Sequence, residues 1–264
     1  TAQLARSVAC IWTLDGHARE RDEAPQVILP DGRAEFVIHL GDTFARVDRG
    51  AIQRQPWAIF AGQLDRPLML QPTGRVAVLG VRFHPEGAAR FTRVPQHEFA
   101  GQTVDVALAS PWLADVARRV RESTASLPDA VRLVERLLGA NDRQNAGDRR
   151  VASGVDAIIR SGGRAAIDGV AAEIGVSRRQ LEPLFLRDVG LPPKQLARIV
   201  RFQRAIRILS QDASPARGIR TAHASGYADQ AHFIRDFREF AGCAPMQHLV
   251  ARGDMTGFST GHNP

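Results

Sequence analysis

The sequence contains very little cysteine, lysine and tyrosine. Among its 264 residues only Cys10 and Cys243 are cysteines, one residue is a tyrosine, and Lys194 is the only lysine within 35 Lys+Arg. Two cysteines so far apart exclude a disulfide framework and a cysteine-based zinc site. No signal peptide and no apolar run of membrane-spanning length can be recognised. We therefore expect a cytoplasmic protein that has no membrane partner.

Catalytic signatures are missing as well. The sequence has no phosphate-binding glycine motif, no His-Glu-x-x-His, no Gly-x-Ser-x-Gly and no convincing Ser-His-Asp triad. His39 and His84 lie in or beside expected strands, but a carboxylate and a third ligand do not accompany them, so no metal site is expected. We predict that the protein is not an enzyme and uses no cofactor.

The charge that is present is unevenly distributed. Residues 1–150 carry 20 Lys+Arg against 18 Asp+Glu, a net charge of +2, whereas residues 151–264 carry 15 against 10, a net charge of +5. A basic region favours a polyanionic partner, because its cations contact phosphates and release counterions. The second half of the chain is therefore the candidate for binding DNA.

Short apolar runs separated by Gly, Pro and Asp fill the first half. The expected strands are 10–14, 27–29, 35–40, 57–61, 68–71 and 76–83. Their close spacing is typical of an antiparallel sandwich or barrel. Apolar residues then recur at helical spacing over Pro111–Glu122 and Leu127–Leu138, which predicts a helical hairpin at about 110–138. The polar stretch 139–150, rich in Gly and Asn, is interpreted as a linker.

The second half has the pattern of a helical domain. Helices are expected at 152–161, 168–174, 178–188, 194–210, 219–225, 230–241 and 246–251. Asp168, Ser177 and Asp229 are the expected N-caps. The predicted fold class is thus α+β, with an N-terminal antiparallel β-rich domain at 1–138 and a C-terminal all-α domain at 151–251. A flexible tail is expected at 252–264.

Two helix-turn-helix units repeat within the C-terminal domain, at 168–190 and 218–242. Each has a glycine in its turn, a polar cap and a second helix with buried Phe, as in Phe233, Phe237 and Phe240 of the second unit. In such a unit the second helix enters the major groove of DNA. The connecting helix 194–210 is about 25 Å long, which suits the separation of about 34 Å between successive major grooves.

The double unit resembles the DNA-binding domain of the AraC/XylS family of transcription regulators over about residues 152–250. The resemblance rests on two stretches of sequence. One is GYADQAHFIRDFREFAG, followed by Pro245, and the other is VGLPPKQL at the end of the first unit. PDGRAEFVIHLGD and VLGVRFHPEGAARF are similar to the regulatory domains of such proteins. The resemblance implies a sequence-specific regulator whose partner is double-stranded DNA. It also admits a small-molecule effector, a homodimer and contact with RNA polymerase.

The resemblance also assigns DNA contacts to particular positions. Base reading is expected from Gln230, His232, Ile234 and Arg235 in the second unit, and from Arg179 and Glu182 in the first, where Pro183 is the third matching outward position. Phosphate binding is expected from Arg178, Arg187 and Arg238. The chain departs from the family where Pro183 replaces a common arginine and Leu186 a basic or polar residue. A proline inside a helix removes a hydrogen bond and can kink the helix, which argues against base reading by the first unit.

Three further interpretations of the sequence remain open. Trp12, Trp57, Phe60 and Phe83 could line a ligand pocket, although aromatic residues of this kind more often belong to a core. A second possibility is a small-molecule-binding or signalling protein with a degenerate DNA-binding domain, which Pro183 would favour. The third is a DNA-modifying enzyme that uses Cys10, although the Pro-Cys-His-Arg context of such enzymes is missing.

Overall fold

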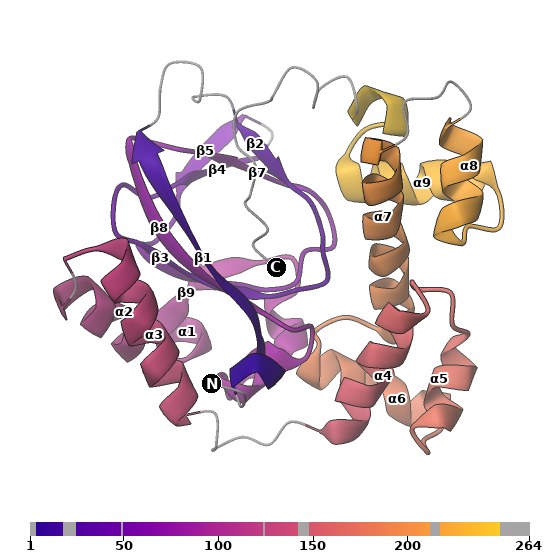
Figure 1. Cartoon of the computed structure of the whole chain (residues 1–264), viewed down its shortest axis with the longest axis horizontal. Coiled ribbons are helices and arrows are strands. Elements are labelled where there is room, and N and C mark those ends of the chain that lie inside the picture. Colours follow the sequence, from indigo (N-terminus) through magenta and orange to yellow (C-terminus); the bar gives the residue numbers. More distant parts are fainter. Residues whose placement is uncertain are drawn as a thin grey trace.

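The computed structural model describes residues 4–17, 25–48, 50–123, 125–141, 148–211 and 217–248. Figure 1 shows a β-rich domain covered on one side by helices, next to a helical domain in which the long helix α7 (Pro193–Gln211) joins two helical groups. The predicted α+β fold class is confirmed, because the first domain is antiparallel and ends in a helical hairpin while the second is helical.

Two antiparallel sheets form the β-rich domain. In spatial order, the larger sheet contains β1 (Val8–His17), β8 (Arg75–Phe83), β3 (Glu35–His39), β6 (Ala58–Ala61) and β9 (Thr103–Asp105). The smaller sheet contains β2 (Gln26–Ile28), β7 (Leu68–Gln71), β4 (Ala45–Asp48) and β5 (Ala51–Arg54). All six expected strands are present. The sequence did not predict β4, β5 and β9, because they are short and partly polar.

Alternate side chains of β3 point to opposite faces of the larger sheet. Phe36 and Ile38 are fully buried in the core beneath the helices. Val37 lies on the other face, in a small apolar cluster with Val76 and Val78 of β8. This alternation follows from the period of two in a strand. The larger sheet is thus the central layer of the domain, between the helices and the smaller sheet (Figure 1).

Helices cover the outer face of the larger sheet. They are α1 (Val106–Ala109), α2 (Pro111–Ser123) and α3 (Leu127–Asn141), of which α2 and α3 form the predicted hairpin. Their buried side chains, such as Leu113, Val116 and Val134, join the core of the sheet. Short 3-10 helices complete the domain at η1 (Leu4–Arg6), η2 (Gly87–Arg90) and η3 (Gln96–Phe99).

The helical domain contains both predicted helix-turn-helix units. Its helices are α4 (Arg149–Arg160), α5 (Ile167–Glu173), α6 (Arg178–Asp188), α7, α8 (Arg217–Ser225) and α9 (Gln230–Ala241), followed by a helical turn at 245–248. The first unit is formed by α5 and α6 and the second by α8 and α9. One apolar core, which includes Phe185, Phe202 and Phe237, joins both units to α7.

Some sequence predictions need correction or lie beyond the described residues. Asp168 is not the N-cap of α5, because Ala166 occupies that position; Asp168 lies in the first turn instead. A carboxylate is also favourable there, since it meets the positive end of the helix dipole. Residues 142–147 of the expected linker, residues 249–251 of the last expected helix and the tail 252–264 lie outside the described residues.

The turn between β2 and β3 packs directly on α7. The side-chain Nε2 of Gln203 donates a hydrogen bond of 2.6 Å to the carbonyl of Pro30, and Leu29 packs against the helical core. Gly32 has a φ of +76°, and a Cβ atom at this position would lie 2.8 Å from Cδ1 of Leu196. The left-handed backbone at this position favours glycine, and a larger residue would also displace the end of the Leu196 side chain on α7.

Candidate nucleic-acid interface

We call the second helix of each helix-turn-helix unit its reader helix, so that α6 is the first reader helix and α9 the second. Helix α9 has the caps and the buried face that the sequence predicted. Asp229 is its N-cap, and the carboxylate accepts a hydrogen bond of 2.7 Å from the backbone N–H of His232. Gly242 ends the helix in the left-handed conformation, with a φ of +74°. The three phenylalanines of its inner face are buried in the helical core. These features fix which residues of α9 remain on its outer face.

The outer face of α9 carries two arginines that lack an ion pair within the described part of the chain. Gln230, Arg235 and Arg238 are exposed, whereas Ile234 is partly buried. Neither Arg235 nor Arg238 has an ion pair with another residue of the described ranges. A guanidinium without an internal partner can form the two parallel hydrogen bonds that guanine or a phosphate accepts.

His232 occupies a more enclosed position than its neighbours on α9. Its Nε2 lies 3.7 Å from Oδ1 of the buried Asp236, and 36% of its side chain is exposed. The ring of Tyr227 contacts it edge-on, with 5.3 Å between ring centroids. The sequence expected His232 to face outward, but the side chain lies between Tyr227 and Asp236 at the edge of the outer face.

An ion-pair cluster that the sequence did not predict joins α9 to α7. The guanidinium of Arg198 contacts Asp236 at 2.8 Å and Glu239 at 2.5 Å. Its carbon Cζ also lies 5.0 Å from the ring centroid of Phe240. Burial opposes the charge, but hydrogen bonds to Glu239 and Asp236 raise the pKa of Arg198 above its usual value. Asp236 and Glu239 lie three residues apart, on one side of a helix whose other charged residues are basic. This spacing was the signal in the sequence that could have indicated a shared cationic partner.

The first reader helix, α6, is also capped as predicted. Ser177 and Gln180 form a capping box, in which each side chain hydrogen-bonds the backbone N–H of the other residue. Leu181 and Phe185 are fully buried. The helix continues across Pro183, which is exposed. An exposed proline is tolerated because the carbonyl that it leaves without a partner can be hydrated.

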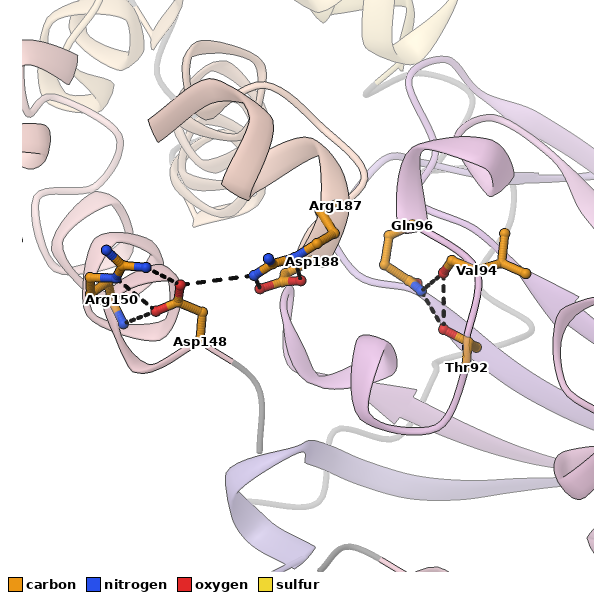
Figure 2. Close-up of polar contacts among 7 residues, drawn as sticks. All are labelled: Thr92, Val94, Gln96, Asp148, Arg150, Arg187 and Asp188. Carbon is orange, nitrogen blue, oxygen red and sulfur yellow. Dashed lines mark hydrogen bonds and ion pairs between the residues drawn. The ribbon is translucent and has the colours of Figure 1, made fainter. Parts of the chain in front are cut away.

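Most of the charge on α6 is neutralised within the protein. Arg178 lies 3.8 Å from Asp168 and 3.7 Å from Glu182. Arg187 pairs with Asp188 at 2.6 Å and lies 3.8 Å from Asp148, which also holds Arg150 (Figure 2). These partners raise the pKa of Arg187, chiefly through the hydrogen bonds to Asp188. Of the three arginines on this helix, Arg179 alone lacks an ion pair with a described residue.

The C-terminal end of α6 faces the β-rich domain. Gln96 of η3 is buried, and its Nε2 donates to Oγ1 of Thr92 at 2.6 Å and to the carbonyl of Val94 at 3.3 Å (Figure 2). A Cβ atom on Gly190, directly after α6, would lie 2.9 Å from the backbone carbonyl oxygen of Gln96. The β-rich domain therefore supports the end of the first reader helix, while the N-terminal residues of that helix are left exposed.

The aromatic residues proposed to line a ligand pocket lie in or beside the core. Phe60 and Phe83 are fully buried beneath the helices of the β-rich domain, and Trp57 packs against the same cluster with Arg121 over its ring. Phe60, Phe83 and Trp57 therefore contribute to the packing of this core, and a ligand-binding role for them stays a prediction.

Several other groups bear on the alternative functions. Cys10 is an exposed free thiol and Cys243 a partly buried one. Over the described ranges, His, Cys, Asp and Glu side chains do not gather in groups of three or more that could hold a metal ion. In the same part of the chain no helix is sufficiently long and apolar to cross a membrane.

Comparison with protein families gives one match in each half of the chain. Residues 1–105 match a domain of unknown function, DUF6597, and residues 170–249 match a helix-turn-helix domain. The second match covers most of both reader units and the whole of α7. None of the curated proteins is similar enough to the chain to count as a match.

Among solved structures, similar chains include two AraC-type proteins. A probable AraC family transcriptional regulator from Rhodopseudomonas palustris is 30% identical; the match covers 39% of this chain and 97% of the other, with a TM-score of 0.36. An AraC-type regulator from Chromobacterium violaceum is 25% identical; the match covers 41% of this chain and 96% of the other, with a TM-score of 0.37. ToxT from Vibrio cholerae is 11% identical; the match covers 94% of this chain and 98% of the other, with a TM-score of 0.48.

Proposed function

We propose, for a chain that belongs to the AraC/XylS family of DNA-binding transcription regulators, that the two reader helices have unequal roles. Helix α9 reads bases through Gln230 and Arg235, with His232 and Ile234 at its edge. Helix α6 contributes phosphate contacts and a smaller share of base reading through Arg179 and Glu182.

The state of the arginines on the two helices supports this division. Arg235 and Arg238 are exposed and have no described ionic partner, whereas Arg178 and Arg187 are already paired with acidic residues. The nearby carboxylates offset part of the positive charge of Arg178 and Arg187, which reduces their attraction for a phosphate. Pro183 also occupies the helix position at which α9 has Arg235, counted from the two N-caps Ser177 and Asp229.

The length of the connector supports simultaneous binding by both helices. Helix α7 has 19 residues and is therefore about 28 Å long. Successive major grooves on one face of DNA are separated by about 34 Å. A straight connector of this length can present α6 and α9 to neighbouring grooves, as Figure 1 shows by their positions at opposite ends of α7.

Replacing Arg235 with alanine tests the role of α9. We expect Arg235→Ala to weaken binding to the preferred duplex by about 1–3 kcal/mol, because a bidentate base contact is lost. The preferred duplex would first be selected from a random library with the parent protein. Binding to it and to a scrambled duplex would then be measured by fluorescence anisotropy. An unchanged ratio of the two affinities would contradict base reading by Arg235.

Arg187→Ala is the matched control in the first unit. Its guanidinium is bound to Asp188, so its loss is expected to change the affinity less, and by a similar factor on both duplexes. A salt titration separates this function from a degenerate DNA-binding domain. Binding of the parent should weaken steeply as salt increases, whereas a chain without DNA-binding activity would show no such dependence.

We also propose that the β-rich domain regulates DNA binding in the cytoplasm, in response to a small-molecule effector. The packing of the β2–β3 turn on α7 supports this role, because the contact joins this domain to the connector of both readers. A homodimer and contact with RNA polymerase remain predictions. Cys10 is an exposed thiol, but exposure alone does not indicate that it reacts with DNA, so we do not favour a DNA-modifying enzyme.

Genome-wide mapping of bound DNA, with and without candidate effectors, tests the regulatory role. We expect occupancy of the preferred sites to change when the effector is present. If the Gln203→Ala variant, which lacks the hydrogen bond to Pro30, showed the same response as the parent, the β2–β3 turn would not be the route of regulation.

A further inference from the structure

We propose that Arg198, Asp236 and Glu239 form a clamp that sets the rotation of α9 on α7, and thereby determines DNA specificity without contacting DNA. The inference rests on the proposed base-reading role of α9. It assigns a positioning role to three residues that lie on or near the inner side of the reader helix.

The geometry of the clamp restricts movement of α9. Arg198 Nε and Nη2 donate to Oδ1 of Asp236 at 3.2 and 2.8 Å. Its Nη1 and Nη2 donate to the two carboxylate oxygens of Glu239 at 3.1 and 2.5 Å. One planar guanidinium therefore holds carboxylates from two successive turns of the same helix. A rotation of α9 about its axis, or a slide along α7, would break several of these bonds together.

The burial of the clamp makes it sensitive to such movement. Asp236 is 1% exposed, and the side chain of Arg198 is 19% exposed. A buried ion pair is weak support for stability, because desolvation of the charges offsets their attraction. A buried polar contact can instead select one arrangement among several that pack equally well, and we infer this use here. The apolar face of α9 is formed by three buried phenylalanine rings, and because apolar burial is not directional, the clamp supplies a directional constraint that these contacts lack.

The first reader helix has no such clamp. Counted from the N-caps Ser177 and Asp229, the positions of Asp236 and Glu239 correspond to Leu184 and Arg187 of α6. Leu184 packs in the helical core, and Arg187 pairs with Asp188. The end of α6 rests on the β-rich domain instead. The clamp is therefore confined to the unit whose outer arginines are free to read bases.

The double variant Arg198→Met with Asp236→Leu tests the proposal. It replaces the buried pair with apolar side chains, leaves the net charge unchanged and copies the leucine of the first unit. We expect the variant to fold, with a similar melting temperature and salt dependence of DNA binding. Its discrimination between the selected duplex and a scrambled duplex should fall by about tenfold or more, since misplacing one or two base contacts has this effect. Affinity for the scrambled duplex should not change.

A second variant and a control make the result decisive. Arg198→Lys keeps the positive charge but lacks the planar fork, and it should reduce discrimination severalfold. If both variants discriminate as well as the parent while Arg235→Ala does not, the clamp proposal is wrong and base reading by α9 stands. If Arg235→Ala also discriminates like the parent, the proposed function of α9 fails, and the clamp proposal fails with it.

Discussion

Replacing Phe237 with alanine is expected to lower the free energy of unfolding of the helical domain by about 3–5 kcal/mol. Phe237 is fully buried. Its ring centroid lies 5.3 Å from that of Phe202 on α7 and 5.6 Å from that of Phe233 on α9. Removing the ring leaves a cavity between the connector and the second reader, because neighbouring aromatic rings cannot collapse fully into it. Urea denaturation followed by circular dichroism measures the change.

Arg238→Ala is the matched control on the neighbouring residue of α9. Its side chain is exposed and has no described ionic partner, so its removal should change the free energy of unfolding by no more than about 0.5 kcal/mol. A loss of less than about 1 kcal/mol in Phe237→Ala would mean that α9 does not depend on the Phe202–Phe237–Phe233 contacts. The two variants together separate the inner face of the reader from its outer face.

The helical domain was predictable because its signals are local. Ser177, Asp229 and Gly242 mark helix ends through caps that involve residues only a few positions away. The spacing of Phe233 and Phe237 identifies the buried face of α9 without knowledge of its partner. Asp168 was wrongly predicted to be an N-cap, and it lies in the first turn of α5 instead. A carboxylate is favourable at either place, so the sequence could not distinguish an N-cap from a first-turn position.

The features that escaped prediction depend on distant residues. Arg198 lies 38 residues from Asp236 along the chain, and Gln203 lies 173 residues from Pro30. Their partners are set by how α7 packs against α9 and against the β-rich domain. Strands such as β5, which is exposed throughout, are specified by pairing with β4 and not by their own apolar pattern.

His39 of the β-rich domain is a further residue whose environment the sequence did not reveal. It lies on β3, is 1% exposed and contacts the ring of Phe44 edge-on at 5.3 Å. Among the described residues, neither ring nitrogen has a hydrogen-bond partner of standard geometry, although Gln55 lies near the ring. Burial lowers the pKa of His39 to about 4, although nearby Gln55 offsets part of this effect. The imidazole is therefore neutral in the folded protein at pH 7.

His39 is expected to make the β-rich domain less stable as the pH falls from about 6.5 to 4. In the unfolded chain its pKa returns to about 6.5, so the unfolded state binds the proton first and is favoured by acid. With a folded pKa of about 4, this group alone should remove about 3 kcal/mol of stability by pH 4. Urea denaturation of the parent and of His39→Gln at both pH values measures it.

The comparison with His39→Gln isolates this effect from that of the carboxyl groups. Burial raises the pKa of Asp31, Glu35 and Glu86. These groups take up protons in the folded state before the unfolded state, so they favour folding as the pH falls and oppose His39. They are common to both proteins and cancel in the difference. The parent should therefore lose more stability than His39→Gln between pH 6.5 and 4, and equal losses would show that His39 is hydrated or hydrogen-bonded in the folded protein.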